Sequence, residues 1–160
     1  MLVSFDKLPE NARVWIYQSN RPFTDEEIPE LEEELKKFIH QWTVHGEDLS
    51  ASYDIKYKRF IVIGVDEDFA STSGCSIDAS VRFIQHLQEK FEVDLLDKMN
   101  VTFRQGEYIS YKDLADFRKM VKARSVSPKT IVFNNLVNTK AELEEYWEVP
   151  MEESWHKRFL

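Results

Sequence analysis

The chain is poor in the residues that mark specialised structures. It contains one cysteine, four glycines and five prolines among 160 residues. The single cysteine, Cys75, has no second cysteine to pair with, so a fold stabilised by disulfide bonds within the chain is excluded. The sequence therefore gives no reason to expect an oxidising compartment. The small glycine and proline content excludes collagen-like and low-complexity chains. With 42% hydrophobic residues, the composition is that of an ordinary globular protein with one core.

Positive charge is also scarce, because 21 Lys and Arg face 29 Asp and Glu, which gives a net charge of −8. Proteins that bind nucleic acids or anionic membranes gain their affinity largely from basic residues. No stretch approaches ~18 consecutive apolar residues, and the first residues lack the basic and apolar regions of a signal peptide. The sequence therefore predicts a cytoplasmic protein that binds neither nucleic acid nor membrane.

Apolar periodicity predicts alternating strands and helices over the first two thirds of the chain. Strands are expected at residues 14–17, 51–57, 60–65 and 101–104, and helices from about 28 to 42 and from 76 to 91. Thr24 and Glu27 form a candidate capping box for the first helix. The order β-α-β-β-α-β is that of the ferredoxin-like fold, so we expect an α+β protein with strand order 4-1-3-2.

The last third predicts an α/β extension of that core. A helix is expected from Ser110, as its N-cap, to about residue 123, followed by a strand at 131–133 and a second capping box at Thr139 and Glu142. Trp155 and Phe159 are expected to pack back on the protein. No repeat or linker interrupts the chain, which predicts one domain over residues 1–160, with its core at about 12–105 and the extension at about 106–160.

In the order 4-1-3-2, three segments would meet at one edge of the sheet: residues 42–46, 66–78 and 104–106. Three of the four glycines lie in these segments, and glycine permits the turns and close backbone approaches that binding sites use, although it also simply makes turns. We therefore expect a ligand-binding site at this edge. Its candidate ligand-binding residues are Trp42, Gly46, Asp66, Ser73, Gly74, Ser76, Asp78 and Arg104.

Cys75 is the most specific candidate for a reactive residue at this edge. A thiol beside a helix N-terminus sees unpaired backbone N–H groups and the positive end of the helix dipole, which favour the thiolate. His45 is three residues beyond Trp42 and is a candidate base. The acidic residues around the segment, such as Asp66 and Asp78, act in the opposite direction and raise the pKa of a thiol. A small buried cysteine beside a helix cap is the alternative interpretation.

No cofactor or metal is predicted. The chain contains neither G-x-x-x-x-G-K-[ST] nor a G-x-G-x-x-G after a strand, so it lacks the motifs of nucleotide-hydrolysing and dinucleotide-binding proteins. Residues 73–76 form only a weak phosphate-binding candidate. The acidic residues 66–68 lack the spacing of a calcium loop, and the histidines and the cysteine lack the paired spacing of zinc ligands.

Several stretches together resemble a family of short uncharacterised bacterial proteins. They are residues 14–21, 38–46, 59–61, 65–67 and 73–78, and the resemblance covers most of the chain up to about Phe91. Members often carry the automated label "ABC transporter ATPase", which the missing Walker motif does not support here. The resemblance implies a cytoplasmic bacterial protein and carries no activity, substrate or catalytic residue.

Together these observations favour a binding or regulatory module over an enzyme, with its site at the edge formed by residues 42–46, 66–78 and 104–106. The partner would be a protein or a small molecule. The alternative is a thiol-dependent enzyme that uses Cys75 as nucleophile and His45 as base. The sequence leaves the ligand, the oligomeric state and the reactivity of Cys75 open.

Overall fold

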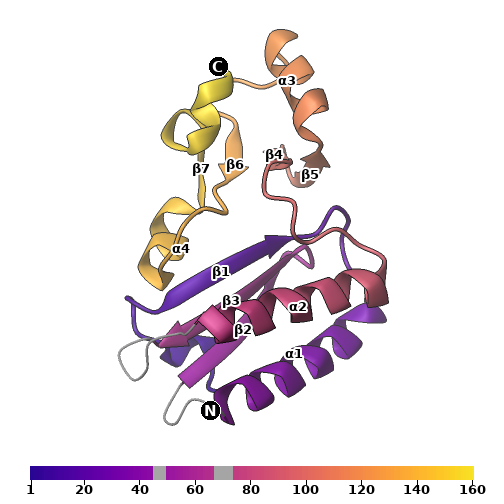
Figure 1. Ribbon diagram of the computed structural model, residues 1–160. Helices are drawn as coiled ribbons and strands as arrows, with labels where there is room; N and C mark the ends of the chain where they lie inside the picture. The colour runs from indigo at the N-terminus through magenta and orange to yellow at the C-terminus, as the bar shows by residue number, and fades with distance from the viewer. Residues whose placement is uncertain (45–49, 67–73) are drawn as a thin grey trace.

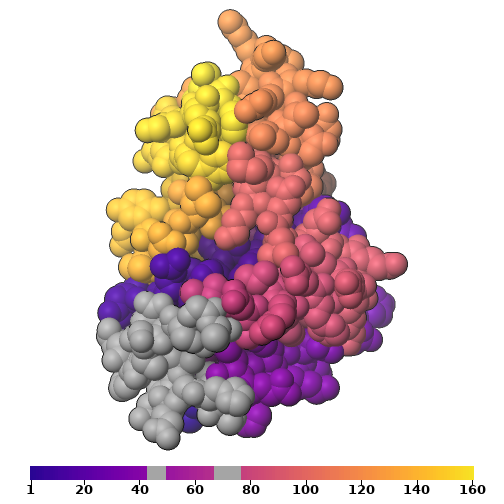
Figure 2. All heavy atoms as spheres, in the orientation of Figure 1, coloured from indigo at the N-terminus to yellow at the C-terminus, as the bar shows by residue number. Residues whose placement is uncertain are grey.

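The computed structural model describes residues 1–44, 50–66 and 74–160. Within these residues the protein is a mixed α+β structure with two antiparallel sheets, and each half of the chain contributes one sheet (Figure 1). The two termini lie at opposite ends of the molecule. The space-filling view shows the second half of the chain, coloured from salmon to yellow, packed above the first half (Figure 2).

The first sheet has the strand order β1-β3-β2, with β3 in the centre. Its strands are β1 (Arg13–Gln18), β2 (Ser50–Lys56) and β3 (Phe60–Asp66). All seven residues of β3 are buried, as expected for a central strand covered on both faces. β2 and β3 pair antiparallel as a hairpin, and they are neighbours as in the expected order 4-1-3-2.

Two long helices cover one face of this sheet, α1 (Glu27–Val44) and α2 (Gly74–Phe91) (Figure 1). The residues that alternate along β1 and β3 on this face meet one apolar stripe from each helix. The resulting core contains Tyr17, Leu31, Leu35, Ile39, Trp42, Ile61, Ile63, Val65, Ile84, Leu87 and Phe91, all buried.

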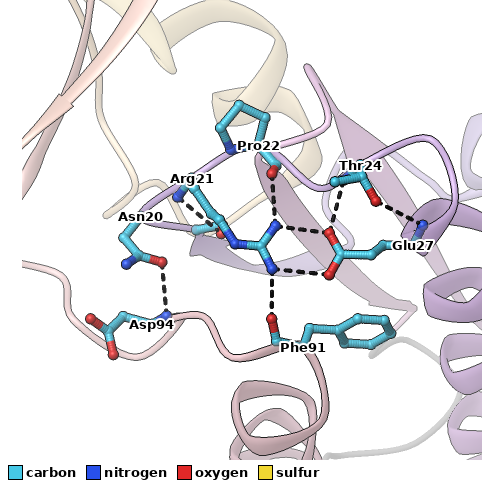
Figure 3. A network of polar contacts seen from close by, with 8 residues as sticks. Asn20, Arg21, Pro22, Thr24, Glu27, Phe91 and Asp94 are labelled. Atoms are coloured by element: carbon cyan, nitrogen blue, oxygen red, sulfur yellow. Dashed lines mark hydrogen bonds and ion pairs between the residues drawn. The ribbon is translucent and has the colours of Figure 1, made fainter.

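The start of α1 is fixed by the predicted capping box. The backbone N–H of Glu27 donates to Thr24 Oγ1 over 3.2 Å, and the N–H of Thr24 donates to Glu27 Oε1 over 2.9 Å (Figure 3). Pro29 is the third residue of the helix, where its missing N–H has no helical partner to lose. The helix therefore begins at Glu27 despite the proline.

The second sheet has the strand order β5-β4-β6-β7. Its strands are β4 (Val101–Gln105), β5 (Tyr108–Lys112), β6 (Ile131–Phe133) and β7 (Glu148–Pro150), and α3 (Leu114–Lys122) follows β5. A second core links this sheet to α3 and to the short 3-10 helices η2 (Met151–Glu153) and η3 (Trp155–Phe159). It contains Val101, Phe103, Phe117, Val126, Val132 and Met151.

A third core joins the two halves of the protein. It covers the other face of the first sheet, where Val14, Ile16, Phe60 and Val62 meet residues from β6, from α4 (Lys140–Tyr146) and from the segments beside α4. At Gly64 the short helix η1 (Phe5–Lys7) approaches this face so closely that an added Cβ would lie 2.7 Å from Leu8 Cδ1. The first sheet is therefore buried on both sides.

The ferredoxin-like order is not confirmed. Three strands take the expected positions 1-3-2, but β4 does not lie beside β1 and instead pairs with β5 and β6. The physical reason is local: Gly106, with φ of +62°, and Glu107 form a two-residue turn between β4 and β5. Closing that short hairpin costs less chain entropy than pairing β4 with the distant β1.

The helix expected from Ser110 begins later. Ser110 lies in β5, where its hydroxyl donates to Gln105 Oε1, and Asp113 is the N-cap of α3, accepting from the N–H of Asp116 over 2.8 Å. Trp155 and Phe159 pack back as expected, with their rings 5.6 Å apart and Phe159 against the second core.

Among the described residues, no helix combines the length and the apolar character needed to cross a membrane.

Candidate functional site

Of the catalytic pair expected from the sequence, His45 lies outside the described residues and the side chain of Cys75 is not described. His45, Gly46 and Ser73 fall in the segments 45–49 and 67–73. Gly74 is the first residue of α2, so Cys75 and Ser76 belong to the first turn of that helix, but their side chains are not described. The use of Cys75 and His45 in catalysis therefore stays a prediction.

Three other predicted site residues lie near the expected edge. Trp42, in the last turn of α1, is buried and stacks on Phe38 with ring centroids 5.3 Å apart, so it is a core residue. Asp66 is the last residue of β3 and is buried. Asp78 is exposed in α2, close to its first turn. Of the three, only Asp78 is presented to solvent.

Arg104 does not join this edge, contrary to expectation, because β4 belongs to the second sheet. Its guanidinium lies 5.0 Å from the ring of Tyr57, in the turn between β2 and β3, and pairs with Glu148 over 2.7 Å. Asp66 lies at the opposite end of β3, about six residues or ~20 Å away. Gly106 forms the β4–β5 turn. The segment 104–106 therefore lies away from the edge at Asp66 where it was expected.

A groove of about 530 Å³ lies between β2 and the start of α1. Neither the glycines nor the cysteine indicated it. We call it the β2 groove. It is lined by Val3, Ser4, Asp25, Ile28, Pro29, Glu32, Ser52, Tyr53, Asp54, Ile55 and Lys58.

Backbone groups at the rim of the β2 groove point away from the sheet. Ala51 bonds outward to the N-terminal segment, since its N–H donates to Met1 O and its carbonyl accepts from the N–H of Val3. Because alternate residues of a strand face the same side, the N–H and C=O groups of Tyr53 and Ile55 also point outward. Among the described residues no backbone hydrogen bond reaches these two residues from outside. The edge is covered at Ala51 and open from Tyr53 to Ile55.

The walls of the groove are apolar with an acidic rim. Ile28 and Ile55 are partly buried against the first core. Burial raises the pKa of the Tyr53 hydroxyl, and the carboxylate of Glu32 raises it further. The only basic lining residue, Lys58, is already paired with Asp25, whose pKa this pairing lowers. A ligand with apolar groups and a positive charge would match this surface.

Asp54 completes the acidic rim, and it pairs with Lys56 of the same strand over 3.2 Å. Charges on an edge strand discourage its pairing with an arbitrary second strand. No group of three or more His, Cys, Asp or Glu residues positioned for a metal ion occurs within residues 1–44, 50–66 and 74–160.

Comparison of the chain with protein-family models, with curated proteins and with solved structures finds no match.

Proposed function

We propose that the protein is a cytoplasmic binding module that holds an extended peptide segment of a partner protein along the open edge of β2. The observation that carries the proposal is the position of the groove: a concavity of about 530 Å³ runs along the part of β2 whose backbone groups face outward. Strand addition of this kind takes its affinity from main-chain hydrogen bonds and its specificity from alternate side chains.

The chemistry of the groove selects the side chains of that segment. Along an added strand, alternate side chains would enter the groove toward Ile28 and Ile55, and these should be apolar. Basic side chains would meet Glu32 and Asp54 at the rim. The expected ligand is therefore a short peptide of alternating apolar and basic residues, and the single unpaired cysteine agrees with the cytoplasmic setting.

A binding measurement tests this directly. The probe is a fluorescein-labelled octapeptide of alternating valine and lysine, titrated with the protein and followed by fluorescence anisotropy. Ile55→Pro removes the outward N–H, and proline is tolerated on an edge strand, so we expect about tenfold weaker binding. Ile55→Ala is the matched control, because it shortens the same side chain and keeps the N–H.

The control outcomes separate strand addition from simple charge attraction. A valine–glutamate octapeptide should bind much more weakly, because the rim repels it. Equal binding of both peptides, or equal loss in Ile55→Pro and Ile55→Ala, would contradict the proposal. Amide hydrogen exchange adds a second readout: Tyr53 and Ile55 should exchange fast alone and slowly with the valine–lysine peptide, while Ser52 and Asp54, which face β3, stay protected.

A thiol-dependent enzyme is the second candidate, supported by the position of Cys75 in the first turn of the 18-residue helix α2. The rate of Cys75 alkylation against pH tests it, because the chain has no other cysteine. A thiolate that titrates well below the free value of ~8.5 would support the enzyme. Slow modification at every pH until the protein unfolds would contradict it.

A further inference from the structure

A small cavity lies at the outer edge of β1, on the opposite side of the first sheet from the β2 groove. Its volume is about 80 Å³. Three separate segments supply its polar lining: Arg13 from β1, Lys98 from the segment before β4, and Asn135 and Asn138 from the segment before α4. We call it the β1 cavity.

The two basic side chains of the β1 cavity have no anionic partner in the part of the chain that the structure describes. Neither Arg13 nor Lys98 forms an ion pair there, although the chain carries 29 acidic residues. The acid next to Lys98 is engaged elsewhere, since Asp97 accepts from the N–H groups of Met99 and Asn100 over 2.9 and 3.2 Å. Two unpaired cations therefore share one cavity in an acidic protein.

Arg13 also carries a buried donor without an acceptor. Its Nε has no hydrogen-bond partner among residues 1–44, 50–66 and 74–160. A buried donor without an acceptor destabilises the structure, and more so when it belongs to a charged group. The guanidinium lies 5.3 Å from the ring centroid of Trp15, a contact that stabilises its position. The arrangement is costly unless an acceptor enters.

Burial and like charge act together on Lys98. Burial lowers the pKa of its ammonium group, and the positive charge of Arg13 lowers it further. The Nζ atom lies 5.9 Å from the ring centroid of Tyr17. The two positive charges line the same cavity and repel each other, so a bound anion would lower the free energy of both.

Hydrogen bonds within the protein fix the polar groups around these cations. Asn135 is held in a fixed orientation, because its Nδ2 donates to Gln18 Oε1 over 2.9 Å and its Oδ1 accepts from Trp147 Nε1 over 2.8 Å. The N–H of Val14 donates outward to Asn138 O over 2.9 Å. By the alternation of a strand, the N–H of Ile16 faces the same edge, where Ile16 lines the cavity.

We propose that the β1 cavity binds a phosphate-type oxyanion through Arg13 and Lys98, beside the outward N–H of Ile16. The guanidinium presents several N–H groups in one plane, which suits an oxyanion with more than one acceptor oxygen, and the ammonium adds a point charge. A volume of about 80 Å³ equals the space of two to three waters in bulk liquid, at ~30 Å³ each, so the cavity takes one small anionic group.

Titration calorimetry with inorganic phosphate, at constant ionic strength maintained with potassium chloride, tests the proposal. We expect saturable binding with a Kd below about 1 mM and a rise in melting temperature with phosphate. Lys98→Met should weaken the binding at least about tenfold and remove that rise. Lys122→Met, the same change at an exposed position on α3, is the matched control and should bind like the wild type.

A second readout excludes a merely structural role for Lys98. Without phosphate, Lys98→Met should melt at the same or a higher temperature than the wild type, because the substitution removes a positive charge that Arg13 repels. A lower melting temperature would contradict the proposal, as would the absence of saturable phosphate binding or unchanged binding in Lys98→Met.

Phenyl phosphate distinguishes the two sources of the anion. If it binds as well as inorganic phosphate, the cavity takes the terminal group of a larger molecule, and if only inorganic phosphate binds, it takes the free ion. Either result supports the proposal. Since the cavity and the β2 groove lie at opposite edges of the sheet, Lys98→Met should leave binding of the valine–lysine peptide unchanged, so the two proposals can fail separately.

Discussion

Arg21 binds both carboxylate oxygens of Glu27, with its Nη1 2.8 Å from Oε1 and its Nη2 2.9 Å from Oε2 (Figure 3). The same Nη2 donates to the carbonyl of Phe91 over 2.6 Å. This one guanidinium therefore ties the loop after β1 to the first turn of α1 and to the last residue of α2. It holds together the ends of the two helices that cover the first sheet.

Acid should weaken this connection. Hydrogen bonding to Arg21 lowers the pKa of Glu27 from 4.5 to about 2, although burial acts against it. The unfolded state therefore binds the proton first as the pH falls, so the stabilisation is complete above about pH 4.5 and is lost between there and pH 2. Because both side chains are partly exposed, we expect Glu27→Gln to cost about 1 kcal/mol at neutral pH.

Urea unfolding at pH 7 and pH 3 measures this effect. The difference between wild type and Glu27→Gln should shrink as the pH falls. Glu26→Gln, an exposed neighbour for which no pairing is described, is the control and should change little at either pH. A Glu27→Gln protein as stable as the wild type at pH 7 would show that the connection contributes nothing.

A buried histidine should give the protein a second sensitivity to acid. His156 is 1% exposed, its Nδ1 lies 2.6 Å from Ser154 Oγ, and burial lowers its pKa from 6.5 to about 4. The unfolded state gains its proton first on acidification, so stability is complete above about pH 6.5 and falls toward pH 4. Between about pH 7.5 and pH 5 we expect a loss of about 2 kcal/mol.

His156→Gln is the comparison, because glutamine does not titrate. The free energy of unfolding in urea should fall by about 2 kcal/mol less for the variant than for the wild type over this pH range. His86, exposed beside Glu34, is present in both proteins and therefore cancels in the difference. Parallel pH curves for the two proteins would contradict the prediction.

Features that depend on residues close together in the chain were predicted well. The capping boxes of Thr24 with Glu27 and of Thr139 with Glu142 act within four residues, and in both the N-cap side chain accepts the expected backbone hydrogen bond. The 51–57 segment was expected to be an edge strand and is one. Such features depend on neighbours in the chain, so the sequence alone is enough to find them.

Pairing over long distances was predicted less well. Strand β5 was missed because the helical spacing of the residues after it was extended back to Ser110, although the turn at Gly106 and Glu107 is a hairpin signal. Because β5 follows β4 directly in the chain, β4 pairs with β5 instead of pairing with the edge of β1. The predicted ferredoxin-like order, and with it the place of Arg104, depended on this one strand.

Neither candidate site could be recognised from a motif. The lining of the β2 groove comes from three segments that are separated in the chain, and Arg13 and Lys98 are 85 residues apart in sequence (98 − 13). An isolated basic residue is usually a solvated surface charge. Only the folded structure shows that these two face one cavity.

Lys140 should stabilise the junction between the two halves of the protein. Its side chain is buried, and its Nζ donates to the carbonyls of Leu8 over 2.8 Å and Asp6 over 3.1 Å, beside η1. Lys140→Met keeps the length of the side chain and leaves both carbonyls without this donor, so we expect a loss of about 2 kcal/mol in urea unfolding. Lys112→Met, at an exposed position on β5, is the control and should stay within about 0.5 kcal/mol of the wild type.

Gly64 should be intolerant of a side chain because of Leu8. A Cβ at position 64 would lie 2.7 Å from Leu8 Cδ1 and 3.1 Å from Phe5 Cε2, and Leu8 is only 3% exposed. Gly64→Ala should therefore cost about 1–3 kcal/mol through overpacking. Leu8→Ala alone should cost about 2–3 kcal/mol, since it leaves a cavity. In the double variant the added methyl group occupies part of that cavity.

A double-mutant cycle measured by urea unfolding checks this relationship. The double variant Gly64→Ala with Leu8→Ala should be more stable than the sum of the two single losses predicts, by at least about 1 kcal/mol. Gly106→Ala is the matched control: its cost comes from the positive φ, and nothing lies within 4 Å of the added Cβ. Leu8→Ala should therefore add to Gly106→Ala without coupling. Additive losses for Gly64→Ala and Leu8→Ala would mean that η1 does not pack on β3 as closely as the structure shows.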